Sequence, residues 1–166
     1  MGWTPEGFVV WAELEDRDIF NPVRKFNEPA FLKGDVFEIF MRPEACETYY
    51  EFHITPCNQL FQYRIPSAAA FRAQRRNGIC QEWLMSSSVL ESSTEIDQLK
   101  KQWQVSVNIP MEKLGRSPLK EHDRWNFSFC RYDYSRNREQ PVLSSVSPLK
   151  KVDFHDQSCW MCAELV

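Results

Sequence analysis

The stretch Gly34–Gln62, GDVFEIFMRPEACETYYEFHITPCNQLFQ, indicates the fold, because it reads as three consecutive β-strands. In each strand, apolar side chains alternate with charged or amide side chains, which gives one apolar and one polar face. Arg42-Pro43 ends the first strand and Pro56 ends the second. A polar face of this kind either holds a polar ligand or faces water.

The same alternation extends outward over most of the chain. Further strands are expected over residues 7–14, 102–109, 125–132, 142–146 and 160–165, with one or two more within 79–91. Residues 67–76 form a short helix or a loop, and 110–114 form a single helical turn closed by Gly115. Many short strands separated by Pro, Asn and Gly predict an all-β fold. The expected architecture is an antiparallel β-sandwich, immunoglobulin-like or jelly-roll-like, with short helical turns in the loops.

Length and charge limit the classes of function. The chain has 166 residues, 43% of them hydrophobic, which indicates a single domain over residues 1–166 with a sizeable core. Its 20 basic and 23 acidic residues give a net charge of −3, which argues against binding to nucleic acid or an anionic membrane. Met1–Gly7 lacks the pattern of a signal peptide, and six reduced cysteines are expected of a cytoplasmic chain. The location would instead be secreted if the N-terminus is truncated.

Several short motifs occur in an order that is similar to a known family. They are a strand ending at Asp16, the run Gly34–Phe40, the run Tyr50–His53, the segment from Trp103 to Pro110 followed by Leu114-Gly115, the run Asn126–Phe129, and Phe154-His155. Together they resemble the family 9 carbohydrate-binding modules over about Trp3 to Leu165. The resemblance implies a β-sandwich. It also implies that the family's first strand is absent, lost or supplied by a partner domain.

The resemblance implies a sugar site as well. Members of the family sandwich a sugar between two aromatic side chains and bind its hydroxyl groups with a carboxylate, an arginine and amides. Glu38 occupies the carboxylate position and His53 the arginine position, while Phe31 and Phe154 fall near the two aromatic positions. Histidine replaces arginine and phenylalanine replaces the usual tryptophan, so the family's sugar specificity is not carried over.

Two further ligand-binding candidates come from the strand alternation. Trp11 and Gln62 fall on the polar sides of their strands, and pairing of neighbouring strands would place them on the same sheet face as Glu38 and His53. Such a face combines planar apolar surfaces with hydrogen-bonding groups, which is what a sugar requires. The alternative is a face in contact with water only.

One loop offers oxygen ligands for a cation. Asp16, Asp18 and Asn21 form an oxygen-rich turn, and calcium takes six to eight oxygen ligands in such loops. The candidate is a structural calcium ion, and the alternative is a solvated acidic turn. No other cofactor is expected.

The sequence therefore predicts a non-catalytic carbohydrate-binding module whose partner is a mono- or oligosaccharide. One alternative is a structural or protein-interaction sandwich with a vestigial ligand face. A minor alternative is a haem-binding sandwich domain, with Met41 and His155 as the iron ligands. Glu38 and Glu51 resemble the carboxylate pair of a glycosidase, but no other feature supports catalysis.

Overall fold

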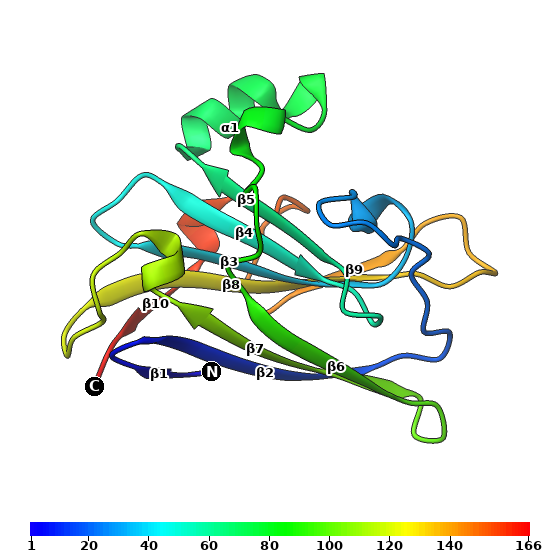
Figure 1. Cartoon of the computed structure of the whole chain (residues 1–166). Helices are drawn as coiled ribbons and strands as arrows, with labels where there is room; N and C mark the ends of the chain where they lie inside the picture. Colours follow the sequence, from blue (N-terminus) through cyan, green and yellow to red (C-terminus); the bar gives the residue numbers. More distant parts are fainter.

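A computed structural model of the whole chain, residues 1–166, shows two antiparallel β-sheets packed face to face (Figure 1). The predicted all-β sandwich is therefore confirmed. The smaller sheet has the order β1-β2-β7-β6. Its strands are β1 (Gly2–Thr4), β2 (Gly7–Glu15), β7 (Gln102–Pro110) and β6 (Glu91–Asp97).

The larger sheet has the order β10-β8-β3-β4-β5, and β9 pairs with the C-terminal end of β8, beyond the part that pairs with β10. Its strands are β3 (Val36–Pro43), β4 (Tyr49–Ile54), β5 (Leu60–Ile65), β8 (Arg124–Asp133), β9 (Val142–Ser145) and β10 (Met161–Glu164). The three strands expected within the opening stretch are thus neighbours, β3, β4 and the start of β5.

The main core lies between the two sheets. Phe37, Ile39 and Met41 of β3 point into it, and they meet apolar side chains of the smaller sheet such as Val105 and Val107 of β7. This is the apolar face that the alternation predicts, and burial of these side chains stabilises the packing of the sheets.

The outer face of the larger sheet is covered rather than open to water. Helix α1 (Ala68–Gln74) lies on the side of this sheet away from the smaller one, and Ser67 caps its first turn (Figure 1). Phe71 of α1 and the C-terminal residues Phe154 and Trp160 pack there in a second apolar cluster. We call α1, residues 75–84 and residues 149–160 the roof.

Short 3₁₀ helices complete the chain: η1 (Ala30–Leu32), η2 (Arg75–Asn77), η3 (Gln81–Trp83), η4 (Glu112–Leu114) and η5 (Gln157–Cys159). The predicted turn at 110–114 is confirmed as η4, closed by Gly115 in the left-handed conformation. The strands expected within 79–91 are wrong, since that segment contributes η3 and one isolated bridge from Leu84 to Tyr63. None of the helices has the length and apolar character needed to cross a bilayer.

Candidate functional site

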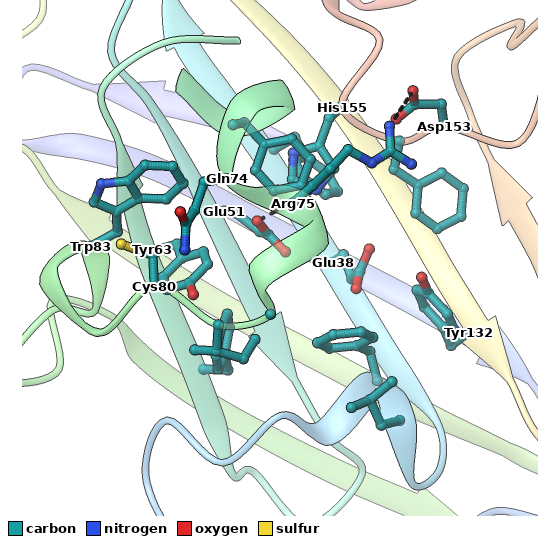
Figure 2. A pocket seen from close by; sticks show the side chains of 18 of the residues that line it. Glu38, Glu51, Tyr63, Gln74, Arg75, Cys80, Trp83, Tyr132, Asp153 and His155 are labelled. Atoms are coloured by element: carbon teal, nitrogen blue, oxygen red, sulfur yellow. Dashed lines mark hydrogen bonds and ion pairs between the residues drawn. The ribbon is translucent and has the colours of Figure 1, made fainter. Parts of the chain in front are cut away.

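A cavity of about 410 Å³ lies between the outer face of the larger sheet and the roof. Figure 2 shows Glu38 and Glu51 on the sheet, with Trp83 and Tyr63 on one side and Tyr132 on the other. The roof contributes Arg75, Asp153 and His155, among other side chains. A pocket of this size suits a small organic ligand.

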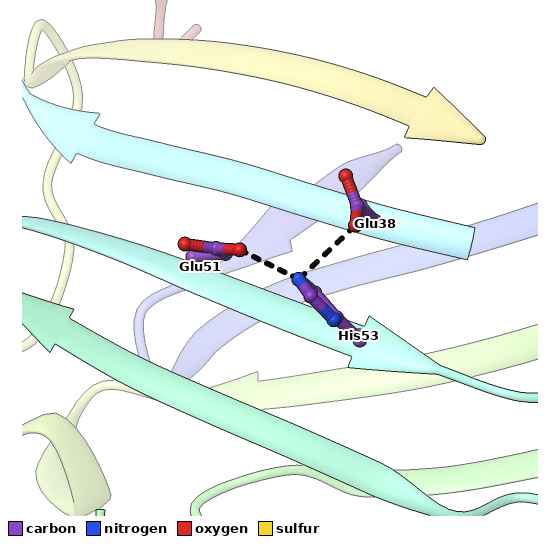
Figure 3. Close-up of side chains that lie close together, drawn as sticks. All are labelled: Glu38, Glu51 and His53. Carbon is purple, nitrogen blue, oxygen red and sulfur yellow. Dashed lines mark hydrogen bonds and ion pairs between the residues drawn. The ribbon is translucent and has the colours of Figure 1, made fainter. Parts of the chain in front are cut away.

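Two buried carboxylates and a histidine form the floor. Glu38 of β3 pairs directly across the sheet with His53 of β4, and Glu51 lies two residues before His53 on the same face. The Nε2 atom of His53 lies 2.7 Å from Oε1 of Glu51 and 3.1 Å from Oε1 of Glu38 (Figure 3). All three side chains are buried, and His53 has no exposed surface. His53 therefore holds the two carboxylates in place.

Part of this floor has no hydrogen-bond partner in the protein. The Oε2 atom of Glu51 is buried and unpaired, with Nε2 of His155 3.7 Å away. The hydroxyl of Tyr63, in the neighbouring wall, is also buried without a partner. Unpaired buried polar atoms are costly, so they mark positions where a ligand would gain hydrogen bonds.

Burial and mutual contact set the charge of the floor. Burial raises the pKa of Glu38 to about 7. Burial acts in the same direction on Glu51, but His155 and His53 beside it hold its pKa below the usual value. Burial opposes protonation of His53, yet Glu38 and Glu51 raise its pKa above the usual value. These shifts favour the charged forms of Glu51 and His53, whereas burial favours the neutral form of Glu38.

The walls are largely aromatic. Phe31 of η1 meets the His53 ring edge-on, with ring centroids 5.5 Å apart, and also contacts Tyr132 at 5.8 Å. Phe154 packs edge-on against Tyr132 at 5.7 Å. On the other side, Tyr63 lies between Phe61 and Trp83. These rings offer planar apolar surface around a polar floor.

The fold is shared with two solved structures, although no protein-family model and no curated protein matches the sequence. A proposed carbohydrate-binding protein from Bacteroides uniformis ATCC 8492 aligns over 98% of this chain and 74% of its own, with TM-score 0.70 and 13% identity. A family 9 carbohydrate-binding module from Caldicellulosiruptor kristjanssonii, in complex with cellotriose, aligns over 98% and 71%, with TM-score 0.65 and 13% identity. The fold is that of a family 9 carbohydrate-binding module. The resemblance found in the sequence is confirmed at the level of the fold.

On this family 9 fold, the structure gathers most of the predicted ligand residues. Phe31, Glu38 and Phe154 line the cavity, and His53 contacts Glu38 of the lining without lining the cavity itself. The sequence placed Glu51 on the same strand face as His53 but considered it only as half of a glycosidase-like pair, and it considered His155 only as a haem ligand. Sequence reasoning missed Tyr63, Trp83 and Tyr132 as lining groups.

Gln62 does not belong to this site. In the hairpin of β4 and β5, His53 pairs with Phe61 and Glu51 with Tyr63, so Phe61 and Tyr63 share the pocket face. Gln62 is turned to the opposite face, where its amide donates to Oγ of Ser88 and its carbonyl accepts from the Val89 amide. The prediction reversed the faces of β5, because a shift of one residue in register exchanges them.

Trp11 does not belong to it either. It lies on β2 in the smaller sheet, on the face away from the core, and 59% of its surface is exposed. Both sheets therefore separate Trp11 from the cavity. The expectation that it shares a face with Glu38 is wrong, because β2 pairs with β7 and not with a strand of the larger sheet.

The predicted calcium ligands are each held by a different partner. Asp16 accepts a bond of 2.8 Å from Arg131, and Asp18 pairs with Arg136. The amide of Asn21 donates to the carbonyls of Ala30 and Asp35. These contacts anchor the loop to β8 and β3. The three side chains thus do not form one ligand set, and calcium binding by this loop stays a prediction.

Two other groups of side chains could hold a cation. One is the floor itself, where ligand atoms of Glu38, Glu51 and His53 lie within 4.8 Å of one another; the second consists of Asp16, Asp35 and Asp133. In the second group Arg131 already compensates Asp16. Asp16 and Asp133 line a pocket as well, but Lys100, Lys101 and Arg138 in the same lining oppose a further cation.

The haem alternative does not fit the geometry. Met41 is fully buried in the core between the sheets, whereas His155 lines the cavity on the outer face of the larger sheet. Because the sheet lies between them, the two side chains cannot bind the same iron atom.

Proposed function

We propose that the chain is a non-catalytic carbohydrate-binding module that holds one sugar unit in the cavity above β3 and β4. The observation that carries this proposal is the combination of a buried, partly unpaired carboxylate floor with aromatic walls. Sugar rings present apolar C–H faces and hydroxyl edges, so they require this pairing of surfaces.

Each part of the pocket has a role in this proposal. Glu38 and Glu51 accept hydrogen bonds from sugar hydroxyl groups, and His53 fixes both carboxylates through its Nε2 atom. Phe31 and Phe154 give stacking surfaces, and the Tyr63 hydroxyl supplies a donor or acceptor that the protein leaves unpaired. A rigid floor favours binding because its side chains are ordered before the ligand arrives.

The comparison proteins support the same conclusion. One is a proposed carbohydrate-binding protein and the other is bound to cellotriose. At 13% identity they support a shared architecture, and the titration below determines which sugar is bound.

The arrangement of the carboxylates supports a binding role over catalysis. Glycosidases place two carboxyl groups on either side of the scissile bond. Glu38 and Glu51 instead contact the same nitrogen atom of His53 and lie side by side in the floor. Both are thus placed to contact the same side of a bound sugar.

Calorimetric titration against a panel of mono- and oligosaccharides tests the proposal, with fluorescence of Trp83 in the pocket wall as a second signal. We expect Glu38→Gln to weaken binding by about tenfold or more, because a charged acceptor is lost. Glu95→Gln is the matched control, since Glu95 is exposed on β6 in the other sheet. Absence of binding across the panel, with unchanged fluorescence, would favour the protein-interaction alternative.

A further inference from the structure

We propose that the sugar carries an amine: the pocket takes an amino sugar in its ammonium form, with the cation placed against Glu51 and Glu38. This inference rests on the proposed function and names the class of ligand for the same pocket.

The floor has two acidic side chains and only one basic side chain. Glu38 and Glu51 both approach one nitrogen atom of His53, at 3.1 and 2.7 Å. One imidazole neutralises at most one carboxylate. The Nη1 atom of Arg75 lies 3.3 Å from Oδ2 of Asp153, and the Arg75 side chain is half exposed. When Glu38 is ionised, one buried carboxylate charge is therefore left without a partner, and buried charges are normally paired.

His155 does not remove this charge. Its Nδ1 atom lies 2.9 Å from the hydroxyl of Tyr49, a hydrogen bond that a neutral imidazole can make in either tautomer. One face of the His155 ring stacks on Phe71, with centroids 3.5 Å apart. Burial in this setting lowers the pKa of His155. Its Nε2 atom is also 3.7 Å from Glu51, beyond hydrogen-bond distance.

An ammonium group would satisfy the floor where a hydroxyl would only partly do so. The Oε2 atom of Glu51 is buried and without a partner, and an ammonium group brings three N–H donors as well as the missing positive charge. The surrounding rings, among them Phe31, Tyr63 and Tyr132, also favour a cation through their negative faces.

The cavity favours an organic cation over a metal ion. Glu38, Glu51 and His53 could ligate a divalent metal, since their ligand atoms lie within 4.8 Å. A metal ion would leave most of the 410 Å³ and its aromatic walls unused. An amino sugar uses both the floor and the walls.

The test compares matched sugars on the full chain near neutral pH by calorimetry. The panel is glucose, galactose and mannose, each with its 2-amino and its N-acetylated 2-amino derivative, and Mn²⁺ and Zn²⁺ alone. We expect one amino sugar to bind about tenfold or more tightly than both its neutral counterparts. Glu51→Gln should remove this preference, while Glu95→Gln should keep it. Melting curves check that both variants are folded.

Other outcomes overturn the inference in distinguishable ways. Equal or tighter binding of the neutral sugars would refute the requirement for an amine and would still support the proposed function. Binding of Mn²⁺ or Zn²⁺ that depends on Glu51, with no preference for an amine, assigns the floor to a metal instead. No binding of any sugar overturns the proposed function as well. If Glu51→Gln does not fold, Glu38→Gln takes its place and must reduce the same preference.

Discussion

Replacement of His53 by phenylalanine separates the electrostatic role of this residue from its packing. A phenyl ring preserves the stacking against Phe61, at 4.7 Å between centroids, and the edge contact with Phe31. It removes the Nε2 atom that bonds Glu51 and Glu38. Both carboxylates then stay buried without a compensating partner.

Breaking a buried ion pair in this way costs about 3–5 kcal/mol. For a chain of this size each kcal/mol corresponds to roughly 2–4 °C in melting temperature, so His53→Phe should melt about 6–20 °C below the wild type. Urea denaturation near pH 8 gives the free energy of unfolding, and a thermal melt gives the melting temperature.

His122→Phe is the matched control. His122 also bonds a glutamate, Glu164 at 2.9 Å, but its side chain is 78% exposed. Exposed pairs contribute less than about 1 kcal/mol, so this variant should unfold almost as the wild type does. If His53→Phe lost no more stability than His122→Phe, the view that His53 compensates buried carboxylates would be refuted.

Three further predictions follow from the placement of single residues. Glu38 has a folded pKa of about 7 against an ordinary value of 4.5, so the folded state holds the extra proton between these values. The free energy of unfolding of the wild type, relative to Glu38→Gln, should therefore fall as the pH rises from 4.5 to about 7; urea titrations at several pH values check this, and a rise would contradict it. Trp11→Ala should leave the affinity for any sugar unchanged, because Trp11 lies in the other sheet, and a weakened calorimetric titration would contradict the placement of the site. Gly34→Ala should destabilise the fold by about 1–3 kcal/mol, because a Cβ atom at this position would lie 2.5 Å from the carbonyl oxygen of Phe20; an unchanged melting temperature would show that the loop can move aside.

The sequence was sufficient for the sandwich because alternation is a local property. In β3, Phe37, Ile39 and Met41 had to share a face, and that face is the core. The strand β6 was missed because its Ser, Thr and Glu side chains carry little apolar signal, and none of its residues is buried at this edge of the smaller sheet.

Only part of the candidate site could be predicted from the sequence. Glu38 and His53 follow from alternation and from the family resemblance, but which strands are neighbours is not a local property. Trp11 was assigned to the wrong sheet for this reason. Of the roof, only Phe154 was predicted, and it came from the family resemblance. His155 and Trp83 reach the pocket from segments without periodicity, through contacts distant in the chain.

The turn between β4 and β5 has a consequence for comparing related sequences. Five residues, Thr55–Gln59, join the strands, with Asn58 in the left-handed conformation, and this length places Phe61 opposite His53. A relative with one residue more or fewer in this turn would present the position of Gln62 to the ligand unless a bulge restored the register. Alignments of proteins with this fold should therefore be anchored on turn length before pocket residues are compared, since identical residues at aligned positions do not ensure that the same side chains face the pocket.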